Sequence, residues 1–258
     1  MDGVDTGYEG KFDFPARTGP PAMAYLLASV PRTGSSWFSH LLWQTGCLGA
    51  PLEYLNFEKS GPYGFASESP DLQQQLWRSV LARRTSSNGV FGIKCFPMQL
   101  EALVQGNPAL LSAVIQTLLP RGRAKKVVHL GRRDRIAHII SYARATMSGI
   151  WRKEQEGAPA PEPEYNEDAL ETANRWLTLQ ESAWAGMYKD LGIEPLRLWY
   201  EEAIADPEGA VRQVADYLGV AIDPQAAVAV PAVEKQSRGA GTDWAEQYAR
   251  SQGPSEGG

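Results

Sequence analysis

The stretch from Tyr25 to Trp37 constrains the fold of this chain more than any other. The apolar run at 25–30 is followed by Pro31-Arg-Thr-Gly-Ser-Ser36 and then at once by an amphipathic run at 37–43. This order is typical of a buried strand, a tight turn and a helix that begins with hydroxyl side chains. A helix N-terminus offers unpaired backbone N–H groups and the positive end of the helix dipole. The sequence therefore predicts a phosphate-binding loop between a strand and a helix.

Each residue of this turn has a chemical use in binding an anion. Gly34 lets the backbone approach a phosphate closely, because it has no side chain. Charge and hydrogen-bond donors come from the side chains of Arg32, Thr33, Ser35 and Ser36. The loop lacks the Gly-Lys-Ser/Thr sequence of ATP- and GTP-binding loops, so no lysine precedes the hydroxyls. We therefore predict a phosphate loop for a ligand other than a nucleoside triphosphate.

Length and composition fit one large α/β domain. The chain has 258 residues, of which 43% are hydrophobic and eight are Trp, so a substantial core can form. Length alone does not exclude two small domains. The net charge of −5 argues against a general nucleic-acid binder. Basic clusters at 121–126 and 132–135 nevertheless flank one predicted strand, where an anionic ligand could be held.

The cysteines and the start of the chain predict a cytoplasmic protein without a metal site. Cys47 and Cys95 have no second Cys or His at ligand spacing, so neither a zinc site nor a structural disulfide is implied. No apolar run approaches the roughly 20 residues that span a bilayer. The N-terminal segment lacks the basic and apolar regions of a signal peptide.

Strand-like apolar runs alternate with helical patterns along the chain. The alternation predicts an α/β fold with a mostly parallel central sheet and helices on both faces. Ligands of such sheets bind beyond the carboxyl ends of the strands, so the turns after Val30, Cys95 and Leu130 should converge on one site. The expected strands cover 23–30, 89–95, 126–130 and 195–200, and the expected helices cover 35–44, 71–84, 99–105, 109–119, 135–149, 167–191 and 207–218.

Segments without a helical or strand pattern mark the ends and one long loop. We expect a loosely held, flexible arm over 1–22, a single domain over 23–250 and a disordered tail over 251–258. The run at 157–164 is too rich in proline for a helix or a central strand. It predicts an exposed loop that forms a rim or a lid.

A second basic element follows the strand expected at 126–130. Its sequence, Arg132-Arg-Asp-Arg and onward to Ser141, passes from a turn into a helix. Arg132 at the turn and Ser141 about two helical turns later could clamp a second phosphate. The alternative is a surface arginine and an ordinary helix serine. The phosphate loop at 31–36 favours the first interpretation.

These two elements resemble those of sulfotransferases that use 3′-phosphoadenosine 5′-phosphosulfate (PAPS) as donor. The sequence from Pro31 to Trp37 resembles the Pro-Lys-Ser-Gly-Thr-Thr-Trp loop that holds the 5′-phosphosulfate in cytosolic sulfotransferases. The sequence from Arg132 to Ser141 resembles the element that holds their 3′-phosphate. The resemblance implies a P-loop-like sulfotransferase fold, PAPS as co-substrate without a metal, and donor contacts from 32–37, Arg132 and Ser141.

The resemblance is closest to the bacterial trehalose 2-sulfotransferase family and runs in order over roughly residues 24–250. It implies in-line transfer of a sulfuryl group to a hydroxyl of a small molecule, a carbohydrate or a glycolipid, and it implies a homodimer. The shared features are an Arg-x-Gly-Ser-x loop at 32–36, a Thr-Gly segment ending in Pro-x-Glu-Tyr at 45–54, a Gly-x-Lys strand end at 92–94, Trp151-Arg152, and Trp244 with Tyr248.

Three residues receive catalytic roles. Arg32 is expected to stabilise charge on the leaving oxygen, and Lys94 either contributes there or is a solvated residue at a strand end. Cytosolic sulfotransferases use the His of Lys-x-His-x-Pro as base, and this chain has Phe96 at that position. The resemblance to the trehalose family instead assigns the general base to Glu53, with a pKa raised by a partly apolar pocket. The alternative for Glu53 is a surface carboxylate.

Looser resemblance implies two more nucleotide contacts. Tyr200 begins a Tyr-Glu-Glu-Ala-Ile segment that resembles the one whose Tyr contacts adenine. Arg238 lies in a run that resembles the basic loop closing over the 3′-phosphate. Alternatively, Tyr200 is an aromatic residue of the core, and Arg238 belongs to a polar linker. Among the histidines, we expect His40 and His129 to be packed and His138 to be packed or to reach the nucleotide.

The residues favour an enzyme over two other classes of protein. A PAPS-dependent O-sulfotransferase is the leading hypothesis. The alternative is a non-catalytic module that binds PAPS or its product 3′-phosphoadenosine 5′-phosphate (PAP), which the missing His favours. A kinase-like phosphotransferase is disfavoured because neither a P-loop lysine nor an Asp pair for Mg²⁺ accompanies the loop. Residues 56–70 and 157–164 are expected to shape the acceptor pocket.

Overall fold

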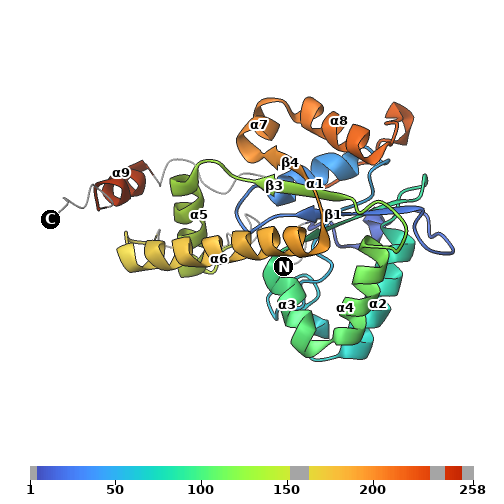
Figure 1. Ribbon diagram of the computed structural model, residues 1–258, viewed down its shortest axis with the longest axis horizontal. Helices are drawn as coiled ribbons and strands as arrows, with labels where there is room; N and C mark the ends of the chain where they lie inside the picture. The colour runs from blue at the N-terminus through green and yellow to red at the C-terminus, as the bar shows by residue number, and fades with distance from the viewer. Residues whose placement is uncertain (1–4, 152–162, 233–241, 252–258) are drawn as a thin grey trace.

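The computed structural model describes residues 5–151, 163–232 and 242–251 of the chain (Figure 1). Its centre is a four-stranded sheet in the order β2-β1-β3-β4, and every strand pair is parallel. The α/β fold with a parallel sheet is therefore confirmed. The strands are β1 (Met23–Ala28), β2 (Val90–Cys95), β3 (Val127–Gly131) and β4 (Leu196–Trp199).

Helices follow each strand of the sheet. The expected bounds of α1, α6 and α8 agree with the structure, whereas the expected strand end at Tyr200 is wrong. Tyr200 begins α7, because β4 runs into that helix without an intervening turn. The helices are α1 (Ser35–Gln44), α2 (Pro70–Arg83), α3 (Pro97–Gly106), α4 (Pro108–Leu118), α5 (Arg135–Ser148), α6 (Glu167–Leu191), α7 (Tyr200–Ala205), α8 (Pro207–Leu218) and α9 (Thr242–Ser251).

Alternate residues of β1 pack on opposite faces of the sheet, as the two-residue period of a strand requires. Tyr25 and Leu27 belong to a buried cluster with residues of α1 and α8. Leu26 and Ala28 belong to a larger cluster that includes Trp184 of α6 and residues of α2 to α5. Figure 1 shows α1, α7 and α8 on one side of the sheet and α2, α3, α4 and α6 on the other. Burial on both faces explains the continuous apolar run of β1.

The strand order predicts where a ligand binds. After β1 the chain crosses to β2 on one side, and after β3 it crosses to β4 on the other side. In open parallel sheets, ligands bind beyond the carboxyl ends of strands at such a switch point. The turns that follow β1 and β3 begin at Ser29 and Arg132, so both basic elements lie at this point.

The segment expected to be a loosely held arm makes specific contacts over residues 5–14. Phe14 is buried. Arg84, at the end of α2, donates to the carbonyl of Gly7 at 2.9 Å and pairs with the carboxylate of Asp13 at 3.0 Å. These contacts attach the segment to the core. Of the expected tail, Ser251 ends α9, and the rest lies outside the described residues.

The described part of the chain shows neither a membrane-spanning helix nor a metal-binding group of side chains. Within residues 5–151, 163–232 and 242–251, no helix is both long and apolar enough to cross a membrane. In the same ranges, no three His, Cys, Asp or Glu side chains are grouped so that they could hold a metal ion. Cys47 and Cys95 are buried free thiols.

Candidate active site

The turn after β1 has an unusual backbone. Arg32 and Gly34 have φ angles of +70° and +78°, in the left-handed region. This conformation is uncommon for arginine, and such strain, worth about 1–3 kcal/mol, gathers at functional sites. Thr33 between them is fully buried, and its hydroxyl donates to the carbonyl of Val30 at 3.0 Å. The Thr33 hydroxyl therefore holds the turn in shape.

Gly34 is covered by the ring of Tyr200. A Cβ atom at position 34 would lie 2.4 Å from two ring carbons of Tyr200, so a side chain does not fit. The same ring packs edge-on against Trp37, with centroids 6.3 Å apart. The guanidinium of Arg132 lies 5.4 Å from the ring centroid of Tyr200. Four residues expected to bind the donor thus form one cluster.

Arg32 connects the turn after β1 to α5. Its Nε donates to Ser141 Oγ at 3.1 Å, and one of its terminal nitrogens donates to the carbonyl of Trp151 at 2.7 Å. Arg132 donates to the backbone carbonyl of Arg32 at 3.1 Å. The two elements expected to hold two phosphates therefore contact each other directly.

Positive charge is concentrated around Arg32. Burial, together with the charges of Arg132 and Arg144, lowers the pKa of Arg32 to about 10. Like charges held this close repel each other, and a bound anion would relieve the repulsion. Arg144 was not among the expected site residues, although it follows Ser141 by three residues and so shares its helix face.

Lys94 and Glu53 form a buried ion pair beside the turn. Lys94 Nζ lies 2.8 Å from Glu53 Oε1 and donates to Ser36 Oγ at 2.7 Å. The two residues are 1% and 7% exposed, so Lys94 is not a solvated residue at a strand end. The loop that carries Glu53 runs along β2, where the N–H of Lys94 donates to the carbonyl of Leu52 at 3.1 Å.

The second carboxylate oxygen of Glu53 accepts two amide hydrogen bonds. Asn56 Nδ2 and Gln99 Nε2 each lie 3.2 Å from Glu53 Oε2. The backbone N–H of Glu53 donates to the hydroxyl of Tyr8 at 3.1 Å. Glu53 therefore lies among donors and a cation, not in the apolar pocket that the sequence predicts. Gln99 was expected only as the start of a helix, since a single amide carries no sequence signal.

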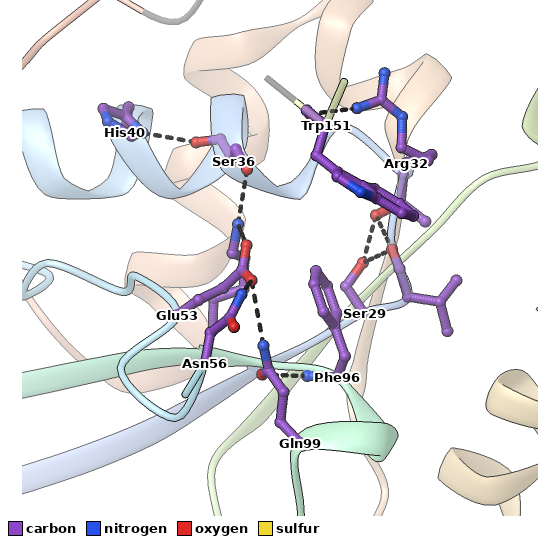
Figure 2. Close-up of polar contacts among 12 residues, drawn as sticks. Ser29, Arg32, Ser36, His40, Glu53, Asn56, Phe96, Gln99 and Trp151 are labelled. Carbon is purple, nitrogen blue, oxygen red and sulfur yellow. Dashed lines mark hydrogen bonds and ion pairs between the residues drawn. The ribbon is translucent and has the colours of Figure 1, made fainter. Parts of the chain in front are cut away.

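Figure 2 shows Glu53 lying between Ser36 and Gln99, with Arg32 and Trp151 on the other side of the view. The ring of Phe96 points into the region between these two groups. Lys94 Nζ lies 5.6 Å from the centroid of this ring. Phe96 stands where cytosolic sulfotransferases have their His, and it has no group that accepts a proton. The carboxylate of Glu53 lies beside the same Lys94 ammonium, 2.8 Å from Nζ.

The histidines have structural partners. His129 Nδ1 lies 2.7 Å from the Tyr188 hydroxyl, and burial lowers the pKa of His129 to about 4. His138 Nε2 donates to the carbonyl of Pro31 at 2.8 Å, and burial lowers the pKa of His138 to about 4. His40 Nδ1 contacts the backbone carbonyl one helical turn earlier. His138 is fully buried, and its hydrogen bond to Pro31 supports the start of the turn after β1.

A cavity of about 350 Å³ lies beside Asn56 and Gln99, between α3 and the loop that precedes α2. The loop expected to shape an acceptor pocket forms much of its lining. The charged side chains of this lining are Glu58 and Glu68. Burial raises the pKa of Glu58, and the negative charge of Glu53 raises it further.

The structure brings together most of the residues expected at the site. Ser35 is buried in the first turn of α1. Arg238 lies outside the described residues, as do positions 157–162 of the proline-rich loop. The residues that meet around the carboxyl ends of β1, β2 and β3 are Arg32, Thr33, Gly34, Ser36, Trp37, Glu53, Lys94, Arg132, Ser141 and Tyr200.

Two kinds of sequence comparison agree on one family. The sequence model described as Stf0 sulphotransferase matches residues 24–251. The trehalose 2-sulfotransferase of Mycobacterium tuberculosis is 27% identical over 254 residues, covering 87% of this chain and 93% of the relative. That of Mycolicibacterium smegmatis is 25% identical over 258 residues, covering 88% and 94%. A solved sulfotransferase from Alicyclobacillus acidocaldarius is 15% identical, with a TM-score of 0.49 over 91% of this chain and 93% of that one.

Proposed function

The chain belongs to the Stf0 sulphotransferase family, and we propose that it moves a sulfuryl group from PAPS to a hydroxyl of a carbohydrate. The observation that carries the donor assignment is the contact of Arg32 with both Arg132 and Ser141 at the switch point of the sheet. The names of the two mycobacterial relatives support a carbohydrate as the acceptor class.

The donor would occupy the two basic elements. The 5′-phosphosulfate would lie at the N-terminus of α1, where Ser36 and backbone N–H groups offer hydrogen bonds. The 3′-phosphate would take the donors of Arg132 and Ser141. The ring of Tyr200 lies against the glycine of the turn and beside Arg132, which supports an adenine contact. Arg238 as a cover for the 3′-phosphate stays a prediction of the resemblance.

Sulfuryl transfer would use a base at the acceptor oxygen and cations at the leaving oxygen. The acceptor oxygen attacks sulfur in line with the bond to the phosphate oxygen while Glu53 takes the acceptor proton. That sulfur–oxygen bond breaks, and its electron pair moves to the phosphate oxygen. Arg32 and Lys94 stabilise the developing negative charge there. Lys94 can act at this point because it already contacts Ser36.

The surroundings of Glu53 support a neutral, hydroxyl-rich acceptor. The adjoining cavity carries acidic side chains, Glu58 and Glu68, which repel an anionic acceptor. Its amide side chains can hydrogen-bond to hydroxyl groups. Trp151 is 36% exposed and packs edge-on with Tyr142 at 5.6 Å, which suits stacking on a sugar ring. A homodimer and a cytoplasmic location stay predictions.

Titration calorimetry with PAP tests the donor site, with AMP and ATP as controls. Micromolar or tighter binding of PAP and much weaker binding of AMP would support a 3′-phosphate site made by Arg132 and Ser141. No preference for the 3′-phosphorylated nucleotide would contradict the proposed donor.

A further inference from the structure

The two carboxylate oxygens of Glu53 lie in different environments. Oε1 faces the ammonium of Lys94 at 2.8 Å. Oε2 accepts from the amide nitrogens of Asn56 and Gln99, each at 3.2 Å. An oxygen that already accepts two N–H donors has no position for a proton unless one donor is lost. This difference between the two oxygens determines which of them can accept a proton.

The amide of Gln99 cannot reverse its direction. Its Oε1 accepts from the N–H of Phe96 at 3.1 Å, at the start of α3, so its nitrogen must point to Glu53. Turning the amide over would set N–H against N–H and carbonyl against carboxylate. Gln99 is 6% exposed, so water does not compensate for the two lost hydrogen bonds.

Hydrogen bonds at both ends of the amide also fix the orientation of Asn56. Its Oδ1 accepts from the N–H of Glu58 at 3.3 Å, which leaves Nδ2 to donate to Glu53. Two backbone N–H groups, that of Phe96 just before α3 and that of Glu58 in the loop after Glu53, thus orient two amides toward the same carboxylate oxygen. Figure 2 shows both amide side chains beside Glu53.

We propose that Asn56 and Gln99 are positioning residues that commit Glu53 Oε2 to hydrogen bonds and reserve Oε1 for the acceptor proton. This inference rests on the proposed sulfuryl transfer. As the new oxygen–sulfur bond forms, the acceptor proton passes to Oε1. The bond from sulfur to the phosphate oxygen breaks, and its electron pair stays on that oxygen. Lys94 then pairs with the leaving oxygen in place of Oε1, and the proton later passes from Glu53 to water.

Other titratable groups face Glu53 from several elements. Lys94 and Cys95 come from β2, Glu58 comes from the loop after Glu53, and Tyr8 comes from the N-terminal segment. Burial and the charge of Glu53 raise the pKa of the Cys95 thiol, which keeps it neutral. The ammonium of Lys94 favours the ionised carboxylate. The variants that follow leave these four groups in place.

The test replaces each amide by its isosteric acid. Gln99→Glu and Asn56→Asp keep the oxygen that accepts from the backbone N–H, but they exchange a donor to Oε2 for a like charge. The pKa of Glu53 should rise, so the acid limb of the kcat–pH profile should move to higher pH by about one unit or more. PAP affinity at neutral pH should stay near that of the native protein.

Gln180→Glu is the matched control. Gln180 is 4% exposed, and its Oε1 accepts from the N–H of Met98 at 3.0 Å, at the same helix start as Gln99. This variant adds the same charge but leaves both amide donors to Oε2 in place, so the acid limb should not move.

If both variants fold and the acid limbs of their kcat–pH profiles match that of the native protein, the positioning role of Asn56 and Gln99 is overturned. If Gln99→Glu does not fold, Asn56→Asp in the loop decides by the same criterion. Absence of transfer by the native protein would instead contradict the proposed function, which keeps the two failures distinct.

Discussion

Lys94 links the turn after β1 to the proposed base, because it contacts both Ser36 and Glu53. A buried ion pair is stable only when further hydrogen bonds satisfy both charges, and here Ser36, Asn56 and Gln99 supply them. Removing one partner of such a pair costs about 3–5 kcal/mol, because the other charge stays buried. Every substitution at Glu53 or Lys94 therefore needs a stability measurement beside its activity.

Arg32→Ala should weaken PAP binding about 10- to 100-fold, because a charge-assisted contact to phosphate is worth about 1.5–3 kcal/mol. Titration calorimetry measures the change. The control is Arg78→Ala, which removes an exposed arginine of α2 and should bind PAP like the native protein. Equal affinity of the Arg32 variant and the native protein would remove Arg32 from the donor site.

Most of the residues proposed for the donor site lie in two short segments, at 31–37 and 132–141, so the sequence alone could suggest them. Glu53 was proposed as the base from the resemblance, but its contacts with Lys94 and Gln99 could not be predicted from the sequence. Lys94 reaches Ser36 across 58 positions, and Gln99 reaches Glu53 across 46. Only the packing of the loop that carries Glu53 along β2 brings these side chains together.

At the scale of elements, the turn after β1 and the start of α7 fit against each other. The sequence predicted α1 to the residue, since a glycine and two serines mark its start. It placed Tyr200 in a strand because the apolar pattern of β4 continues into α7. The left-handed turn at Gly34 and the ring of Tyr200 lie against each other where we propose that the donor binds.

Gly34→Ala should therefore be more harmful than the strain of an alanine at positive φ alone, because the new Cβ atom would also clash with the ring of Tyr200. Gly122 offers a matched comparison, because its φ angle of +74° is similar and a Cβ there meets nothing within 4 Å. Gly122→Ala should cost about 1–2 kcal/mol of stability and keep PAP affinity. Gly34→Ala should cost more and lose PAP binding, as judged by urea unfolding and calorimetry. Equal effects of the two substitutions would contradict the contact with Tyr200.

His138→Gln tests the buried support beneath the turn. The folded-state pKa of about 4 lies below the ordinary value of 6.5, so the unfolded chain binds the proton more readily. Burial of the neutral imidazole therefore contributes to the free energy of unfolding in full above pH 6.5, and this contribution is lost as the pH falls toward 4. A glutamine can still donate to Pro31 but does not titrate. Between pH 7 and 4.5, the free energy of unfolding of the variant should therefore fall by about 2 kcal/mol less than that of the native protein. Urea unfolding at both pH values checks this, and parallel losses would show that His138 does not titrate as described.

At the scale of the whole molecule, the N-terminal segment supports the site from outside the sheet. Tyr8 accepts from the backbone N–H of Glu53, and Arg84 holds the segment through Gly7 and Asp13. The sequence predicted a flexible arm because the composition of this segment resembles that of flexible termini. Its attachment depends on an arginine far along the chain, which local composition does not reveal.

Arg84→Ala should lower the free energy of unfolding by about 3 kcal/mol or more, because it leaves Asp13 and buried carbonyls without their donor. The neighbouring Arg83→Ala is the control. Arg83 has a side chain 53% exposed and lies 3.7 Å from the same Asp13, so it should cost less than about 1 kcal/mol. Chemical unfolding measures both values, and similar losses would contradict the role of Arg84.

The overall α/β architecture could be predicted because strand and helix patterns alternate clearly along the chain. The acceptor could not be predicted in the same way. Its expected surroundings combine the loop before α2 with α3, and the residues of that cavity form no continuous motif.

The most direct test of the account is transfer of a labelled sulfuryl group from PAPS to a panel of neutral saccharides, with EDTA present. The native protein should form a labelled sugar product. Glu53→Gln should bind PAP with nearly native affinity and turn over about 10²–10⁴-fold more slowly, the usual scale for loss of a general base. Tight PAP binding by the native protein without transfer to any saccharide, or undiminished turnover by Glu53→Gln, would contradict the account.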